Sequence, residues 1–223
     1  IMGRSGCGKT TLLKTLGLID RPSDGSIILT GQSISKMTED ELADARRDKI
    51  GFIFQDFYLM DSLTVRENIM IPLILKDEDP CKMKSLVDIY TKKFQIESLL
   101  SRHTSELSGG ERQRVLFAKI LTQESQVILL DEPTASLDMR HEEDLLKEVS
   151  KEKDKDKIVI LVIHNLRTAI KYCSRLILLS NGNIIKDGTV EEVITEENLN
   201  NVFGIKTKVY YNEISKSLDF CII

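Results

Sequence analysis

Short apolar runs alternate along the chain with segments in which apolar positions recur at helical spacing. The runs of strand length are Ile50–Phe54, Gln126–Leu130 and Lys157–Ile163. Runs with so little polar content are typical of strands that are buried on both faces of a parallel sheet. The segments with helical character around them are Thr11–Leu16, Met37–Arg47 and Glu111–Leu121. This alternation predicts an α/β fold built on an open sheet.

Two regions depart from the alternation. Residues 56–105 show helical periodicity with breaks at Pro72 and Pro80 and contain no convincing strand, which indicates an inserted helical subdomain. Later in the chain, Ser180-Asn181-Gly182 is a strong hairpin signal between two apolar segments, Arg175–Leu179 and Asn183–Gly188. The remaining expectations are a strand at Ser26–Leu29, a solvated charged loop at Lys151–Lys157, a short acidic helix at Val190–Asn198, and strand character at Lys208–Tyr211 and Phe220–Ile222.

The composition narrows the class of protein. The 223 residues are 41% hydrophobic and 30% charged, which suits a globular core, and the net charge of −4 arises from interleaved acidic and basic residues. Such a balance gives no broad electrostatic reason to bind nucleic acid or an anionic membrane. The cysteines are too widely spaced to favour a metal site or a disulfide framework: Cys7, Cys81, Cys173 and Cys221. No signal peptide and no apolar run of membrane-spanning length is found, so we expect a cytoplasmic protein.

The most specific motif lies at the start of the sequence. Gly3 to Thr10 fits the phosphate-binding pattern G-x-x-x-x-G-K-[ST]. In such a loop backbone N–H groups surround a phosphate, Lys9 reaches the β- and γ-phosphates, and the hydroxyl of Thr10 ligates Mg²⁺. A glycine turn that fits by chance is the alternative. The residues predicted to hold the nucleotide are Gly3, Arg4, Ser5, Gly6, Cys7, Gly8, Lys9, Thr10 and Thr11.

A second glycine motif, Leu107-Ser108-Gly109-Gly110, precedes the helical segment Glu111–Leu121. Two adjacent glycines after a serine can form an anion-binding nest, with the positive end of a helix behind it. On its own, Ser-Gly-Gly is a loop in most proteins. Beside the first motif it becomes a candidate for a second phosphate site.

Polar residues also stand at the carboxyl ends of the predicted buried strands, where open α/β sheets bind their ligands. Gln55 follows the first strand and is a candidate sensor of the γ-phosphate or Mg²⁺. Asp131 and Glu132 follow the second strand, where one acid can hold Mg²⁺ and the other can act on an attacking water. His164 follows the third and is a candidate catalytic residue. Taken singly, an acidic pair arises by chance and a lone histidine is usually structural.

Together and in this order, the motifs resemble the ATPase subunit of an ATP-binding cassette (ABC) transporter. The resemblance runs over nearly the whole chain, through Gly3–Thr10, Gln55, Leu107–Gly110, Ile128–Glu132, Ser136–Asp138 and His164. It implies a P-loop NTPase of the ABC type that binds ATP and Mg²⁺ and hydrolyses the ATP. In this family two subunits pair head to tail, so that the loop from Ser108 to Gly110 of one subunit closes over the ATP of the other. Asp138 would lie at the dimer seam.

The resemblance also implies roles for single residues. Asp131 would support the metal, and Glu132 resembles the base that polarises the attacking water. His164 resembles the switch that contacts the γ-phosphate. Gln55 resembles the sensor that couples Mg²⁺ and water to the membrane subunit, and so is both a catalytic and a metal-site candidate.

The resemblance divides the chain into parts. It implies a RecA-like nucleotide-binding core at residues 1–55 and 106–205, a helical subdomain at 56–105 and a C-terminal extension at 206–223. Family members carry further residues before the P-loop, including strands of the central sheet and an aromatic residue that stacks on adenine. Only Ile1 and Met2 precede Gly3, so we expect these N-terminal strands to be missing from this sequence.

The implied partner is an integral membrane permease, which would hold the subunit on the inner face of the cell membrane. The run Arg46–Met60 is similar to the group that exports macrolides and antimicrobial peptides or releases lipoproteins. By contrast, Asp138–His141, Lys171–Cys173 and Thr195–Leu199 look like importers of iron–siderophore, haem or cobalamin. We favour export or extraction of a peptide, drug or lipoprotein, because the Gln55 loop and the helical subdomain receive the permease in this family.

Other hypotheses stay open. A truncated regulatory cassette that pairs with partners but does not turn over ATP would follow from the missing adenine contact. An ABC ATPase of DNA repair or translation is less favoured, since those usually carry tandem cassettes or long coiled-coil insertions, and we expect no nucleic-acid partner. Phe57, Tyr58 and Leu59 are candidate contacts for the permease, with packing inside the subdomain as an equal alternative.

Overall fold

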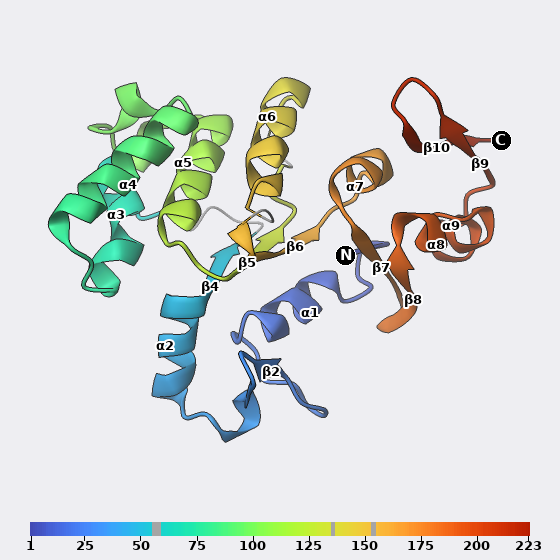
Figure 1. Cartoon of the computed structure of the whole chain (residues 1–223), viewed down its shortest axis with the longest axis horizontal. Coiled ribbons are helices and arrows are strands. Elements are labelled where there is room, and N and C mark those ends of the chain that lie inside the picture. Colours follow the sequence, from blue (N-terminus) through green and yellow to red (C-terminus); the bar gives the residue numbers. More distant parts are fainter. Residues whose placement is uncertain (55–58, 135–136, 153–154) are drawn as a thin grey trace. The chain divides into compact units, whose positions relative to one another are not determined.

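The computed structural model describes residues 1–54, 59–134, 137–152 and 155–223 (Figure 1). Its internal contacts divide the chain into two compact units. The first unit joins the two ends of the chain, Ile1–Leu13 and Leu161–Ile223, and the second consists of Lys14–Ile160. Within the described ranges, no helix combines the length and the apolar composition that crossing a bilayer requires.

A parallel sheet forms the centre of the second unit. Its strand β4 (Ile50–Ile53) pairs in parallel with β5 (Val127–Asp131), and β6 (Ile158–Val162) follows in the order β4-β5-β6. The core residues of β5 are almost completely buried: Ile128, Leu129 and Leu130. The three apolar runs are therefore strands, and the α/β class expected from their composition is confirmed.

Two α-helices precede strand β4 in the chain. Helix α1 (Lys9–Leu16) is followed by Gly17, where a β-carbon would lie 2.8 Å from the ring of Phe52 on β4. Helix α2 (Glu39–Lys49) begins at a capping box formed by Thr38 and Glu41 and runs directly into β4. The strand expected at Ser26–Leu29 is present only as a two-residue ladder, β2 (Ile28–Leu29) with β3 (Gln32–Ser33).

Helices α3 (Val65–Leu75), α4 (Pro80–Lys93) and α5 (Gly109–Thr122) pack together in the second unit (Figure 1). The short 3₁₀ helices Glu97–Leu99 and Thr104–Glu106 connect α4 to α5. Pro80 starts α4, where the missing N–H has no cost. The expected break at Pro72 is wrong, because Pro72 lies inside α3. It is buried there beside Ile69 and Leu73, so packing offsets the lost backbone hydrogen bond.

The charged run after helix α6 (Met139–Ser150) is only partly solvated. The side chain of Glu152 is 0% exposed, and its carboxylate accepts hydrogen bonds from Lys155 Nζ at 2.8 Å and Lys157 Nζ at 2.7 Å. A carboxylate can be buried at tolerable cost only when it is paired in this way. The expectation of a solvated loop is therefore wrong for Glu152.

The first unit contains a second small sheet, in the order β1-β7-β8. Strand β1 (Met2–Gly3) pairs in parallel with β7 (Arg175–Ser180), and β7 pairs antiparallel with β8 (Asn183–Thr189). Asn181 and Gly182 have φ values of 49° and 78°, as the tight turn of a hairpin requires. The hairpin expected around these residues is confirmed.

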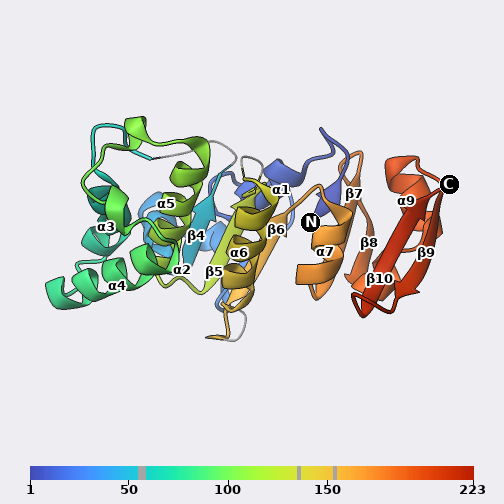
Figure 2. The same ribbon diagram turned by 90° about the horizontal axis from the view of Figure 1, so that it is seen from above.

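The rest of the first unit comes from the segment between His164 and β7 and from the segment after β8. It consists of α7 (Leu166–Tyr172), α8 (Val190–Val193), α9 (Glu196–Phe203) and an antiparallel hairpin, β9 (Thr207–Asn212) with β10 (Ser217–Ile222) (Figure 2). The single helix expected at Val190–Asn198 is in fact two, because Thr195 caps a new helix by accepting from the N–H of Asn198. The strand character expected near both ends of the last segment is confirmed by β9 and β10.

Candidate nucleotide-binding site

The phosphate-binding loop lies in the first unit, where it connects β1 to α1. Gly6 and Gly8 have φ values of 76° and 99°, in the left-handed region that glycine adopts without steric cost. A β-carbon on Gly3 would lie 2.3 Å from the carbonyl oxygen of Leu179. The three glycines of the motif are therefore required by the shape of the loop.

Lys9 closes this loop. Its side chain is largely buried, with the residue 6% exposed, and Nζ donates to the carbonyl oxygens of Gly3 at 3.1 Å and Arg4 at 2.9 Å. These bonds join the last residue of the loop to its first residues. The cation is thus held within the loop by the chain's own backbone.

Later parts of the first unit support the loop from behind. The N–H of Gly182, in the β7–β8 turn, donates to the carbonyl of Cys7 at 3.2 Å, and the N–H of Cys7 donates to the carbonyl of Arg4 at 3.3 Å. The guanidinium of Arg4 lies against Gly204, where a β-carbon would be 2.4 Å from Nη2. The loop is therefore held in place by the β7–β8 turn and by the C-terminal end of α9.

His164 lies in the same unit as the loop. The N-terminal nitrogen of Ile1 donates to the carbonyl of Leu161 at 2.7 Å, and the N–H of Ile163 donates to the carbonyl of Ile1 at 3.2 Å. This is the pattern of a parallel pair, so the segments that lead to the P-loop and to His164 run side by side in one direction. The structure thus places exposed His164 and the start of the loop at the ends of two neighbouring parallel segments of the first unit.

The acidic pair lies in the second unit, at the end of β5. Asp131 is 1% exposed, and Glu132 is more accessible and has a φ of 47°, which turns the chain sharply after the strand. The buried side-chain amide of Gln113 donates to the carbonyl of Pro133 and so anchors this turn to α5.

Gln113 was not among the residues singled out from the sequence. It is a polar residue on the otherwise apolar face of α5, at helical spacing from Phe117 and Ile120. A buried amide at such a position must find a hydrogen-bond partner, which is the signal that could have identified it.

The Ser-Gly-Gly motif forms the start of α5 in the second unit. Gly109 and Gly110 belong to the first turn of the helix rather than to a loop before it. Ser108 is the N-cap, and its hydroxyl donates to the carboxylate of Glu111 at 2.7 Å. These hydrogen bonds from Ser108 hold the pKa of Glu111 below its ordinary value. Ser108 and Gly109 are exposed, so the helix N-terminus is accessible to an anion.

The other predicted residues have separate positions. Asp138 is an exposed N-cap of α6, which accepts from the N–H of His141 at 3.0 Å and contacts its ring nitrogen Nδ1 at 2.7 Å. Gln55 and its neighbours Phe57 and Tyr58 lie outside the described residues. The P-loop and His164 thus share the first unit, whereas Asp131, Glu132, Ser108–Gly110 and Asp138 belong to the second.

Comparisons with known proteins agree with these motifs. The family model described as ABC transporter matches residues 1–135. The bacitracin export ATP-binding protein BceA of Halalkalibacterium halodurans is 38% identical over 185 residues, which cover 82% of this chain and 73% of that protein. The methionine import ATP-binding protein MetN 1 of Bacillus cereus (strain ATCC 14579) is 36% identical over 213 residues, or 95% of this chain and 60% of that protein.

A solved structure is similar as well. The ATP-binding cassette MJ0796, in a dimeric post-hydrolysis state bound to ADP and Pi, has a TM-score of 0.79 and 32% sequence identity, with 85% of this chain and 83% of that chain covered. The likeness extends over most of both chains, so it concerns the cassette as a whole rather than the P-loop alone. The chain therefore belongs to the ATP-binding subunits of ABC transporters, and its activity is ATP hydrolysis.

Proposed function

We propose that this subunit uses MgATP hydrolysis to drive a membrane permease that exports or extracts a peptide, drug or lipoprotein. The observation that carries the use of ATP is the P-loop of the first unit, with Lys9 held inside a loop whose glycines have a close backbone contact at Gly3 and positive φ at Gly6 and Gly8. Because Lys9 is already buried and oriented, phosphate oxygens can meet the cation with little reorganisation.

The remaining residues have separate proposed roles in phosphoryl transfer to water. Glu132 polarises the attacking water as general base, and His164 contacts the γ-phosphate from the edge that it shares with the loop. In this reaction positioning and charge stabilisation carry most of the rate. Gln55 is proposed to sense the metal and the water.

The donor atoms available for a metal ion fit Mg²⁺. The hydroxyl of Thr10 and the carboxylate of Asp131 are hard oxygen ligands, and Mg²⁺ in nucleotide sites is usually bound by one or two protein oxygens together with phosphates and water. Bound Mg²⁺ would neutralise charge on the phosphates. Thr10 and Asp131 are accordingly the proposed metal-site residues, with Gln55.

A second copy of the chain is the proposed partner at the nucleotide. The accessible start of α5 at Ser108, Gly109 and Gly110 would face ATP bound by the partner's P-loop, and Asp138 would lie at the seam between the copies. The dimeric state of the cassette MJ0796 supports this arrangement.

The relatives support both directions of transport. The export-named relative matches the chain at 38% identity, and the import-named relative matches a larger share of it at 36%. We favour export because the run Arg46–Met60, which is similar to the export and extraction group, includes the proposed permease contacts Phe57, Tyr58 and Leu59. Import, including uptake of iron–siderophore or haem, is the second candidate, since the match to the methionine importer covers 95% of the chain.

The parts proposed for these tasks are a nucleotide-binding core at residues 1–55 and 106–205, a helical subdomain at 56–105 that receives the permease, and a C-terminal extension at 206–223. Through the permease the subunit would lie on the inner face of the cell membrane. No nucleic acid takes part in this proposal.

Two substitutions test the catalytic part. Lys9→Ala should abolish ATP binding, because it removes the only side-chain cation that closes the described P-loop. Glu132→Gln should bind MgATP without turnover and accumulate as a dimer on size-exclusion chromatography. If both variants hydrolyse ATP at the rate of the unsubstituted chain, the proposed roles are wrong, and if the unsubstituted chain binds ATP without turnover, a regulatory cassette is the better description.

The direction of transport requires the partner. The chain would be tagged in its own cells, the membranes solubilised, and the co-purifying membrane protein identified by mass spectrometry. A permease with few helices and a large external domain supports export or extraction, whereas one with many helices favours metal-chelate uptake.

A further inference from the structure

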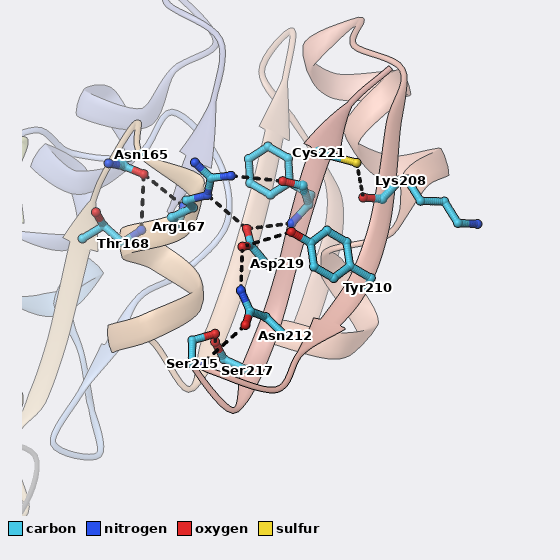
Figure 3. A network of polar contacts seen from close by, with 11 residues as sticks. Asn165, Arg167, Thr168, Lys208, Tyr210, Asn212, Ser215, Ser217, Asp219 and Cys221 are labelled. Carbon is cyan, nitrogen blue, oxygen red and sulfur yellow. Dashed lines mark hydrogen bonds and ion pairs between the residues drawn. The ribbon is translucent and has the colours of Figure 1, made fainter.

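The C-terminal hairpin is attached to the helix that follows His164. Strands β9 and β10 form a regular antiparallel pair from Thr207–Ile222 to Asn212–Ser217, and β10 lies beside α7 within the first unit (Figures 2 and 3). Residues of the hairpin and of the first turn of α7 share a network of polar contacts (Figure 3). This network connects the end of the chain to the neighbourhood of a proposed catalytic residue.

Arg167 and Asp219 form the centre of the network. The guanidinium of Arg167 donates from Nε to Asp219 Oδ1 at 3.0 Å and from Nη2 to the carbonyl of Phe220 at 3.2 Å. It also lies over the ring of Phe220, 5.4 Å from the centroid. One side chain of α7 thus contacts β10 through an ion pair, a backbone carbonyl and an aromatic face, which together fix its direction.

The hairpin in turn holds Asp219 in place. Its second oxygen, Oδ2, accepts from Asn212 Nδ2 at 3.2 Å and from the hydroxyl of Tyr210 at 3.4 Å, both on β9. Asn212 also accepts from the N–H of Ile214 at 3.0 Å and so shapes the turn between the strands. Arg167 holds the pKa of Asp219 below its ordinary value, so the carboxylate is charged at neutral pH.

The backbone N–H of Arg167 is hydrogen-bonded to Asn165, the residue next to His164. Asn165 is the N-cap of α7, and its side chain accepts from the N–H groups of Arg167 at 3.0 Å and Thr168 at 3.3 Å. Arg167 is therefore fixed by Asn165 at its backbone and by the hairpin at its guanidinium. His164 directly precedes the cap, so its position depends on the position of this first helical turn.

The same C-terminal segment also borders the P-loop. Gly204 ends α9 with a φ of 70° and lies against the guanidinium of Arg4. Glu196 at the start of α9 pairs with Lys208 Nζ at 3.1 Å and accepts from the N–H of Val209 at 3.2 Å, both on β9. Helix α9 and the hairpin thus form one connected segment that contacts the P-loop at one point and the His164 helix at another.

We propose that Arg167 and Asp219 are positioning residues for ATP hydrolysis: through them the C-terminal hairpin holds the turn after His164 in register with the P-loop. The inference rests on the proposed role of His164. It predicts that the hairpin contributes to turnover without touching the nucleotide. A ligand or protein that displaces the hairpin would lower turnover in the same way.

The main test uses the full chain with Arg167→Ala and Asp219→Ala. Each should lower kcat for ATP by roughly three- to thirty-fold, the range of effects that positioning contacts remote from the ligand have. KM for ATP should stay within about twofold, because the P-loop contacts are unchanged. The double variant should be no slower than the slower single variant, since both residues act through one contact.

A matched control separates this role from general destabilisation. Arg175 and Asp187 form another exposed ion pair of the first unit, with two bonds of 2.7 Å each, but it joins β7 to β8 and involves neither Asn165 nor the C-terminal hairpin. Arg175→Ala should leave kcat within about twofold of the unsubstituted value. Equal losses of kcat in Arg167→Ala and Arg175→Ala would overturn the inference.

A third comparison separates the inference from the function on which it rests. His164→Ala should lower kcat strongly, and adding Arg167→Ala to it should cause no further loss if Arg167 acts through His164. A normal kcat for His164→Ala would contradict the proposed role of His164 itself. If His164→Ala is slow but Arg167→Ala is normal, or if Arg167→Ala lowers kcat by the same factor in both backgrounds, the positioning role alone is overturned.

Discussion

Replacing Asn68 by alanine should destabilise the second unit more than most polar substitutions do. Asn68 lies in α3 and is 0% exposed. Its Oδ1 accepts from the N–H of Met60 at 2.8 Å, and its Nδ2 donates to the carbonyls of Met60 at 3.0 Å, Leu63 at 3.3 Å and Thr64 at 3.0 Å. One buried amide therefore holds the whole turn that precedes the helix.

The size of the effect follows from the groups left without partners. The carbonyl of Met60 keeps a bond from Thr104 Oγ1 at 3.1 Å, and the carbonyl of Thr64 keeps the helical bond from the N–H of Asn68. The N–H of Met60 loses the amide oxygen that accepts from it, and a donor left without a partner away from water costs about 1–3 kcal/mol. With the smaller losses from the other bonds, we expect a total of roughly 2–4 kcal/mol.

Urea denaturation followed by circular dichroism would measure this change as a lower midpoint at constant m-value. Asn183→Ala is the matched control, because Asn183 is exposed and its amide makes a single bond to the carbonyl of Asn181 at 3.1 Å. That control should change the free energy of unfolding by less than about 0.5 kcal/mol. A loss below about 1 kcal/mol for Asn68→Ala would refute the reasoning.

Two further substitutions probe the second unit. Gly17→Ala should cost about 1–3 kcal/mol of unfolding free energy, because the new methyl group would meet the ring of Phe52 at 2.8 Å, and an unchanged thermal midpoint would contradict this. Burial alone would raise the pKa of Glu152, but the hydrogen bonds from Lys155 and Lys157 outweigh it, so the pKa lies below its ordinary 4.5. Glu152 therefore stabilises the fold fully above pH 4.5 and loses this effect as the pH falls further. Glu152→Gln, which keeps one acceptor oxygen, should cost roughly 1–3 kcal/mol at pH 7, with a difference that shrinks on acidification, and a pH-independent difference would contradict the pairing.

The strands could be predicted because the signal for each of them is local. β4, β5 and β6 are continuous apolar runs, and their composition determines both their conformation and their burial. The β7–β8 turn at Asn181-Gly182 was equally local, since these residues tolerate the positive φ that a tight hairpin needs. Where conformation depends on a few adjacent residues, the sequence is sufficient.

The errors arose where packing overrides a local preference. Pro72 disfavours a helix interior, yet it is buried in α3 among apolar neighbours. The charged run around Glu152 predicts a solvated side chain, yet Glu152 is buried because Lys155 and Lys157 of the same run pair with its carboxylate. The division between α8 and α9 has a different, local cause, because Thr195 is a good N-cap residue in the middle of the predicted helix.

The candidate site was only partly accessible from the sequence. The P-loop and the strand-end residues follow from motifs, but the contacts that orient them join distant positions. Arg167 and Asp219 have no spacing that would pair them in advance, and Gly204 has no motif that connects it to Arg4. Such pairs are set by the tertiary fold, so a single sequence contains no sign of them.

The P-loop itself depends on the far end of the chain. Only glycine fits at position 3, because of the nearby carbonyl of Leu179. The carbonyl of Cys7 accepts from the N–H of Gly182, and Arg4 lies against Gly204. Every one of these partners lies more than half the chain away, and loop closure over such separations is slow and entropically costly. The shape of the phosphate loop should therefore form late, after β7, β8 and α9 have assembled around β1. Nucleotide binding would then require the folding of the whole first unit and not only of the phosphate-binding motif. Because ATP binds only the folded loop, it would stabilise the same distant contacts that form the loop.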